Sequence, residues 1–342
     1  MQNSLRKNSQ RFYIYITVCL VLLFIATFIS VNTGLIDISF WSFIQTLLGS
    51  GSPDNALTIF SFRLPRICMA ILVGIGIAVS GVILQSISSN PLADPGILGI
   101  NTGAGFAIVV YTYFIQGLVF LNSWTSVFLM PFIALIGALL AAVTIYLLAY
   151  KKGKLTPTRM LLVGIGINAA FSAGITIFQL RMNPTDFTRT LVWLSGSIWG
   201  STWTFVLTLL PWIVIFIPVV FYKARVLDIL SLNEITAIGV GINVTQERKK
   251  LLVLAVLLAG ACVAVGGGIT FLGLIAPHIA KKLVGSSHFR VIPLSALIGA
   301  LLILISDTIS RIVIAPAELP VGIVLSIIGA PYFIYLLLKT RG

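Results

Sequence analysis

Three arginines are the residues of this sequence best suited to recognising a charged partner. Arg63 and Arg66 flank Leu64-Pro65 beside a long apolar run, and Arg311 follows a later one. A guanidinium group presents a rigid fork of N–H donors that pairs bidentately with a carboxylate. These side chains could therefore receive acidic groups of a partner. The plainer alternative is that they only reach the membrane surface with their charged ends.

Two ionisable residues, His278 and Asp307, stand inside apolar runs. Residues of this kind are functional candidates by default, because a charge inside a bilayer is costly. They are far apart in the sequence and would make a poor proton relay. Asp307 can instead pair with Arg311, one helical turn further on. We favour that structural pairing.

The sequence holds no cluster of metal ligands and no nucleotide-binding loop. Its histidines and cysteines are few and dispersed, without the short spacings of metal sites or of a disulfide framework. The motif G-x-x-x-x-G-K-[ST], which cradles the phosphates of ATP, does not occur. We therefore predict no metal, no cofactor and no catalytic residue in this chain.

Small residues recur at helical spacing in a later apolar run, where Gly164 and Asn168 are four positions apart. In a bilayer such faces let helices approach closely, which is our first interpretation. A secondary hypothesis is that Gly166, Asn168 and Ser172 line a passage for a substrate.

The composition places these residues in an all-α, multi-pass membrane protein. Of 342 residues, 58% are hydrophobic and only 9% are charged, with a mean hydropathy of +1.09. A helix needs roughly 20 apolar residues to cross a bilayer. The stretch 12–31 is too long for a signal peptide and lacks its cleavage pattern, so we expect a retained first span. We predict one transmembrane domain over 1–342, with about ten spans near 12–31, 65–86, 96–115, 124–149, 159–180, 203–222, 250–270, 272–285, 293–310 and 320–338.

The charges indicate the orientation of these spans. With both termini in the cytoplasm, every lysine falls on the inner side. The positive charges left outside are all arginines: Arg63, Arg66, Arg181, Arg189 and Arg311. This asymmetry follows the positive-inside rule. The net charge of +13 is therefore a signal of topology and does not predict binding to nucleic acid.

The longest polar segment, 223–250, is predicted to be cytoplasmic. Its part 228–241 has apolar residues at helical spacing, with Asp228 near the expected helix start and Gly239 and Gly241 as stop signals. A short amphipathic helix that cannot span suggests a docking element. The alternative is an ordinary interfacial helix.

A weak internal repeat is also present. The segment 72–83 (LVGIGIAVSGVI) is similar to 258–269 (LAGACVAVGGGI). On the predicted topology the first copy runs inward and the second outward, which is the sense of an inverted repeat, a common plan of transporters. The alternative is a chance similarity between two helices rich in small residues.

Several segments carry a resemblance to a known family, in the same order over about residues 60–340. They are Arg63-Leu-Pro-Arg66, Ser80-Gly81-x-x-x-Gln85, Asn90-Pro-Leu-Ala-Asp-Pro-Gly96 with Leu98-Gly99, Leu232-Asn-Glu234 with Ala237-x-Gly239, Phe271-x-Gly273-Leu-x-x-Pro277-His278, Ala317-Glu-Leu-Pro-x-Gly322 and Gly329-Ala-Pro331. Together they resemble the iron–siderophore and vitamin B12 permease family of ABC importers. The resemblance implies ten helices per subunit, two permease subunits around a central pathway, two cytoplasmic ATPase subunits and an extracytoplasmic binding protein.

The resemblance also implies roles for particular residues. The loop between spans six and seven would dock on the ATPases through Asp228, Leu232, Glu234, Ala237 and Gly239. The outer arginines Arg63, Arg66 and Arg311 would receive glutamates of the binding protein. The fifth and tenth spans would line the pathway, through Gly166, Asn168, Ser172 and Ser326. A cytoplasmic gate before the fifth span would hold Thr156 and Thr158, although Pro157 departs from the hydroxyl-rich pattern expected there.

The function implied is the permease subunit of an ABC importer that carries a ferric siderophore across the bacterial cytoplasmic (inner) membrane. The alternative is that a member of the same family imports cobalamin or haem. A secondary transporter driven by ions would need coupled carboxylates within its spans, and only Asp307 lies clearly inside one. A membrane enzyme would need clustered catalytic residues. The type of siderophore, and whether the second permease is identical or related, stay open.

Overall fold

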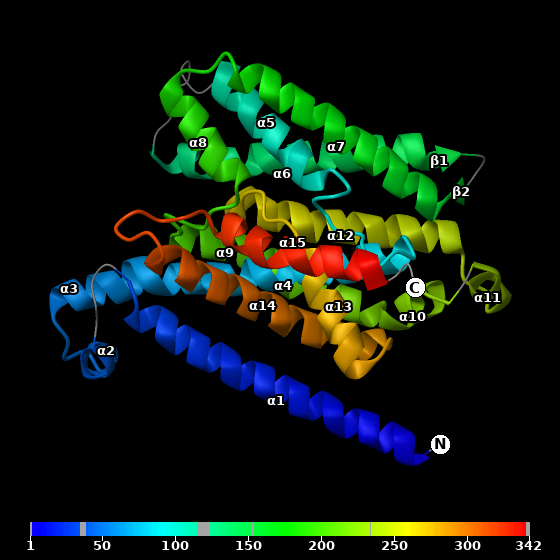
Figure 1. Ribbon diagram of the computed structural model, residues 1–342, viewed down its shortest axis with the longest axis horizontal. Coiled ribbons are helices and arrows are strands. Elements are labelled where there is room, and N and C mark those ends of the chain that lie inside the picture. The colour runs from blue at the N-terminus through cyan, green and yellow to red at the C-terminus, as the bar shows by residue number, and fades with distance from the viewer. Residues whose placement is uncertain (1, 35–38, 115–122, 152–153, 233, 340–342) are drawn as a thin grey trace.

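The computed structural model describes residues 2–34, 39–114, 123–151, 154–232 and 234–339, which are almost entirely helical (Figure 1). In these residues, eight helical segments are long and apolar enough to cross a membrane. Two shorter helices, α5 (Ile100–Phe114) and α13 (Leu272–Val284), stand where the third and eighth spans were expected. The prediction of an all-α membrane protein with about ten spans is confirmed.

The long helices form a bundle with a different set of short elements at each end (Figure 1). The long ones are α1 (Gln2–Asn32), α4 (Leu64–Ile87), α6 (Ser123–Ala149), α7 (Pro157–Gln179), α9 (Trp203–Tyr222), α12 (Val244–Gly266), α14 (His288–Ile312) and α15 (Val321–Lys339). The short helices α2 (Phe40–Leu47), α3 (Pro53–Ala56) and α8 (Pro184–Leu194) lie toward one end. The other end holds α10 (Ala224–Leu230), α11 (Glu234–Gly239) and the strands β1 (Tyr150–Lys151) and β2 (Lys154–Leu155).

Both chain termini lie at the end that carries α10 and α11 (Figure 1). An even number of crossings requires this arrangement. Following the charge asymmetry of the sequence, we call this the inner end, and the end with α2, α3 and α8 the outer end.

The centre of the bundle is α4, which packs on α12 and α14 through small residues. A β-carbon on Gly74 would overlap the backbone of Gly299, and one on Gly81 would overlap the backbone of Gly273. Ser80 in α4 donates a hydrogen bond to the Ala255 carbonyl of α12, at 2.8 Å. Close approach of the helices therefore explains these glycines.

The second span is longer than the sequence indicated. The helical run continues outward from the predicted 65–86 through a π-helical stretch, η1 (Leu57–Arg63), to Pro53. Pro65 cannot donate a backbone hydrogen bond, and the π-helical turns before it accommodate that loss. Arg63 and Arg66 therefore lie inside a continuous helical run and not at its outer end, which corrects the prediction.

The region of spans seven and eight also differs from the prediction. Asn243 accepts a hydrogen bond from the Gln246 N–H at 3.1 Å, and this N-cap starts α12 several residues before the expected 250. The helix ends at Gly266, and the chain reverses through Gly267 and Phe271, whose φ angles are positive. The antiparallel sense that an inverted repeat requires is present between α4 and α12, because Gly76 meets Cys262 whereas Ser80 meets Ala255. The repeat itself stays a prediction.

Candidate functional site

The outer arginines form one cluster with two carboxylates. Arg66 donates from Nε to Asp307 Oδ1 and from Nη1 to Glu318 Oε2, each at 2.8 Å. Arg311 approaches the other Asp307 oxygen at 3.3 Å, through the i,i+4 pairing that the sequence predicted. We call Arg63, Arg66, Asp307, Arg311 and Glu318 the outer ionic cluster. Since Asp307 is fully buried, its two arginines supply the opposite charge that a carboxylate inside the bundle requires.

The same cluster holds the outer end of the first helix. Arg63 donates a hydrogen bond to the Val31 carbonyl, and Arg311 donates to Ser30 Oγ and to the Thr33 carbonyl. Arg63 and Arg311 are both buried. The sequence interpretation expected guanidinium groups that face outward, and this is corrected: the groups face their own chain, because α1 ends against them. Their role in docking stays a prediction.

A cavity of about 1210 Å³ opens beside this cluster. Its walls come from α8 and its neighbours and from the 316–320 segment, and include Arg189, Trp193, Trp199, Glu318 and Pro320. Glu318 therefore pairs with Arg66 and also lines the cavity. Sequence reasoning missed α8, although Asn183 and Pro184 are a helix-start signal: Asn183 accepts the Asp186 N–H at 2.9 Å.

At the inner end, the 228–241 segment is two short helices and not one. Asp228 lies in the last turn of α10 and not near a helix start, which corrects the prediction. Its carboxylate accepts the backbone N–H of His288 at 2.7 Å and contacts His288 Nδ1 at 2.6 Å. The His288 Nε2 atom lies 2.6 Å from Ser86 Oγ. Asp228 thus caps α14, whose first N–H groups lack helical partners, and ties α10 to α14 and α4.

The helix α11 presents an apolar face with nothing of the described chain upon it. Leu232, just before the helix, and Ile235 and Ile238 within it are 69%, 83% and 58% exposed, whereas Ala237 is fully buried. The helix ends at Gly239, as predicted. Three large apolar side chains side by side at the inner end are unusual for a surface in water and are typical of a protein contact.

The acidic end of α11 is bound to the rest of the chain. Glu234 pairs with Arg248 of α12 at 2.9 Å, and the same Arg248 Nη1 lies 3.2 Å from the Leu155 carbonyl of β2. Sequence reasoning counted Arg248 only as an inner positive charge. Nothing in its spacing from Leu155, 93 residues away, could have indicated the contact.

The predicted gate residues lie immediately after this contact. Thr156 and Thr158 are both exposed, and Thr156 is the residue before α7. The hairpin before them pairs Tyr150 with Leu155. Arg159 donates to the Leu148 carbonyl at 3.1 Å, so the start of α7 is held to the end of α6.

The predicted pathway residues differ in how they are placed. Gly166 and Ser172 are exposed on α7, and a β-carbon on Gly166 would meet nothing within 4 Å. Asn168 is half-buried and accepts a hydrogen bond from Thr102 of α5 at 2.6 Å. Ser326 on α15 is half-buried, with its hydroxyl on the Gly322 carbonyl at 2.7 Å. The structure thus leaves one face of α7 open, holds Asn168 against α5, and bonds the Ser326 hydroxyl within its own helix.

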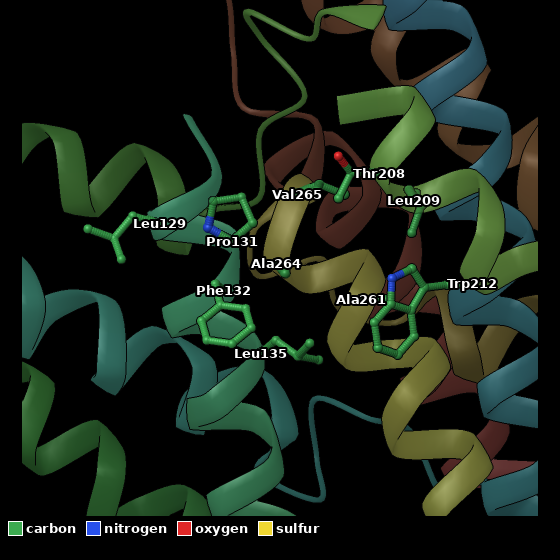
Figure 2. Close-up of a pocket in the computed structure, with 10 residues that line it drawn as sticks. All are labelled: Leu129, Pro131, Phe132, Leu135, Thr208, Leu209, Trp212, Ala261, Ala264 and Val265. Carbon is green, nitrogen blue, oxygen red and sulfur yellow. The ribbon is translucent and has the colours of Figure 1, made fainter. Parts of the chain in front are cut away.

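A separate groove runs between α6, α9 and α12 and has a volume of about 560 Å³ (Figure 2). Phe132, Leu135 and Trp212 project into it, and the side of α12 closes it with Ala261 and Ala264. The one hydroxyl in its lining, that of Thr208, is bonded to the Thr204 carbonyl at 2.8 Å. A lining this apolar offers no chemistry for a charged or chelated cargo, and suits contact with hydrocarbon.

These features define a multi-pass helical membrane protein with a buried centre, an open helix face, and a short helix at its inner end that exposes large apolar side chains. The model of the FecCD transport family matches residues 22–339, so the chain belongs to that family. This confirms the resemblance drawn from the sequence.

Known proteins similar to this chain agree with that assignment. The iron(3+)-hydroxamate import system permease protein FhuG of Bacillus subtilis (strain 168) is 52% identical over 328 residues, which cover 96% of this chain and 97% of FhuG. The hemin transport system permease protein HmuU of Yersinia pestis is 36% identical, covering 94% of each chain. A solved structure of an inward-facing metal-chelate type ABC transporter has a TM-score of 0.82 at 28% identity, covering 95% of this chain and 98% of its own.

Proposed function

We propose that this chain is the permease subunit of an ABC importer that moves a ferric hydroxamate siderophore across the bacterial cytoplasmic membrane. The observation that carries the proposal is the 52% identity to a permease named for iron(3+)-hydroxamate import, over almost the whole of both chains. The chain supplies the passage. ATP hydrolysis resides in partner subunits, and the whole of 1–342 acts as one transmembrane domain.

The partners follow from the two ends of the molecule. The exposed apolar side chains Leu232, Ile235 and Ile238 provide a docking surface for an ATPase subunit at the inner end. Two permease chains, identical or related, would assemble with two such ATPases. The open face of α7, with Gly166 and Ser172, is where a second permease or the passage itself would lie. An extracytoplasmic binding protein would deliver the cargo to the outer end.

The route of the cargo starts at the outer cavity. A volume of about 1210 Å³ is large enough for a bulky chelate, and Trp193 and Trp199 supply apolar surface for its organic shell. From there the route continues along α7 and α15, past Gly166, Asn168, Ser172 and Ser326. It ends at the gate, where Thr156 and Thr158 are exposed. The passage would open at one end at a time as the ATPases bind and hydrolyse ATP.

Docking of the binding protein would engage the outer ionic cluster by exchange of partners. Arg66 already holds Glu318, which lies on a loop and borders the cavity. A carboxylate of the binding protein could replace Glu318 on the Arg66 guanidinium without exposing Asp307. Arg63 and Arg311 would take part indirectly, since both are bound to the end of α1.

The test is uptake of radioactive ferric complexes by cells that lack this gene and by the same cells with it restored. Hydroxamate, catecholate and citrate complexes are compared, with labelled haem and cobalamin beside them. Loss of hydroxamate uptake alone, regained on complementation, is the expected result. Loss of haem or cobalamin uptake with normal iron uptake would keep the family and replace the cargo.

A further inference from the structure

Arg248 stands at the meeting point of three elements of the inner end. It belongs to the second turn of α12, pairs with Glu234 of α11 at 2.9 Å, and reaches the Leu155 carbonyl of β2 at 3.2 Å. It is only 6% exposed. Its Nε is buried without a hydrogen-bond partner among the described residues, and the two hydrogen bonds of this guanidinium are both made by Nη1. Losing either partner would leave this buried charge poorly compensated, which is energetically costly.

The contact on Leu155 lies next to the inner end of α7. Leu155 is followed by Thr156, and α7 begins at Pro157. A second contact ties the last turn of α6, from which the hairpin leaves, to α12, because the Lys249 ammonium lies 5.4 Å from the centre of the Tyr146 ring. The start of α7 is thus fastened to the first turns of α12, and Arg248 is the side chain that extends this fastening to α11.

The neighbouring helix α10 is fastened elsewhere. Asp228 binds His288 of α14, and His288 contacts Ser86 of α4, both of which belong to the buried centre. Besides the ion pair of Lys223, at the start of α10, with Glu247 of α12 at 2.8 Å, the segment between α9 and α12 has two attachments with different destinations. One leads from α10 to the centre of the bundle. The other leads from α11, through Arg248, to the start of the most exposed spanning helix.

We propose that Arg248 is a positioning residue that transmits movement of α11 to the hairpin and the inner end of α7. The inference rests on the proposed function, since it takes α11 as the element that the ATPase moves. One guanidinium that binds both Glu234 and the Leu155 carbonyl makes the two elements move together. The attachment of α10 keeps the centre of the bundle in place.

The test follows accessibility at Thr156 in the complete complex with its ATPases, in lipid. Thr156→Cys is placed in a chain whose native cysteines are alanine, and its rate of labelling by a water-soluble maleimide is measured with and without ATP and vanadate. We call this Thr156→Cys chain the parent, and we expect its labelling rate to change at least about threefold when ATP is added. Arg248→Met should abolish the change while ATPase subunits still co-purify. Lys250→Met, which removes an exposed charge half a turn away, should behave as the parent.

A charge swap separates the two contacts of Arg248. In the double variant Glu234→Arg with Arg248→Glu, the pair between α11 and α12 can form again, but a glutamate cannot donate to the Leu155 carbonyl. We expect the swap to stay unresponsive to ATP. The proposal would be overturned if the charge swap regained the ATP-dependent change in labelling. It would also be overturned if the parent showed no such change, or if the Arg248→Met complex showed it in full. If Arg248→Met fails to accumulate, Arg248→Lys, which can hold one partner at a time, should give a reduced response.

The outcome does not depend on the identity of the cargo. The labelling experiment needs only the chain, its ATPases and ATP. If hydroxamate uptake proves unaffected by deletion but labelling at Thr156→Cys responds to ATP and needs Arg248, the cargo assignment fails and the proposed link stands. If uptake is as proposed and Arg248→Met responds normally, only the link fails.

Discussion

Two of the spanning helices show how unevenly this chain is packed. In the run from Pro53 to Ile87, 78% of the most apolar stretch is buried, whereas in α7 only 11% is. Both are apolar and of spanning length, so hydropathy does not tell them apart. The first is closed on both sides by α12 and α14 through glycine contacts, and it carries Arg66 within its length and Ser86 near its inner end. The second leaves one face without a partner.

This difference separates a region that maintains the fold from regions that are available for contacts with other molecules. A centre that is closed by backbone contacts and buried ion pairs can keep its shape while its surroundings move. Helices with one uncovered face, such as α7 and α11, gain partners only in a larger assembly. Substitutions in the first region should therefore change stability, and substitutions in the second should change assembly or transport while the chain stays folded.

The largest effect is expected where the centre holds its charges. Asp307→Ala should leave the Arg66 and Arg311 guanidinium groups facing each other inside the bundle without their shared carboxylate. Breaking a buried pair in this way costs about 3–5 kcal/mol, so little folded protein should accumulate. The measurement is the amount of protein in the membrane and its thermal unfolding in detergent. Asp54→Ala, which removes an exposed carboxylate at the same end, is the control. Equal stability of the two variants would contradict this account of the cluster.

A glycine pair tests the contrast directly. Gly81→Ala places a β-carbon against the Gly273 backbone and should destabilise the chain by about 1–3 kcal/mol through overpacking. Gly166→Ala adds the same atom where nothing lies within 4 Å, and should leave stability equal or slightly higher. Thermal unfolding of both variants in one detergent decides the matter. Comparable losses would mean that the open face of α7 is already covered in the isolated chain.

Sequence-based prediction succeeded for features that depend on residues close together in the chain. Span number and orientation depend on apolar length and on the placement of lysines, and both can be read without knowing any contact. The i,i+4 pair of Asp307 with Arg311 was also predicted, and it is present in the structure. The gate and the docking segment stay predictions. The short helix α8 was missed because its moderately polar sequence, from Pro184 to Leu194, resembles a loop more than a span.

What sequence could not provide depends on neighbours far along the chain. Arg66 and Asp307 are 241 positions apart, so nothing before the fold indicated that Arg66 was already occupied. The same holds for Asp228 and His288, whose pairing places Asp228 at the end of α10. Arg66 and Asp228 were both recognised as candidates, but each was assigned a partner in another molecule, whereas the structure shows one in this chain.

The uncovered helix α11 should respond to substitution in the opposite way to the centre. Ile235 is 83% exposed, so Ile235→Asp should not change folding of the chain. It should reduce co-purification of ATPase subunits at least about tenfold, because a carboxylate would be buried in an apolar contact, and tenfold corresponds to about 1.4 kcal/mol. Gln246→Asp adds the same charge on an exposed position nearby and is the control. Normal assembly of the Ile235 variant would remove α11 from the ATPase contact.

The smallest effect is expected at Glu318, where the centre meets the outer cavity. Charge reversal of Arg63 or Arg66 would test docking poorly, because both are bound inside the chain and their loss would disturb the fold. Glu318→Gln changes only the cavity-side partner of Arg66, whose side chain is 22% exposed. The glutamine oxygen can still accept from the guanidinium, so stability should change far less than in Asp307→Ala. If a carboxylate of the binding protein must displace Glu318, the variant should bind that protein about two- to fivefold more tightly, and the gain should shrink at high salt. Titration of the complex in lipid discs measures both. An unchanged or weakened affinity would mean that Arg66 serves only the fold, and that the binding protein docks on other residues of the outer end.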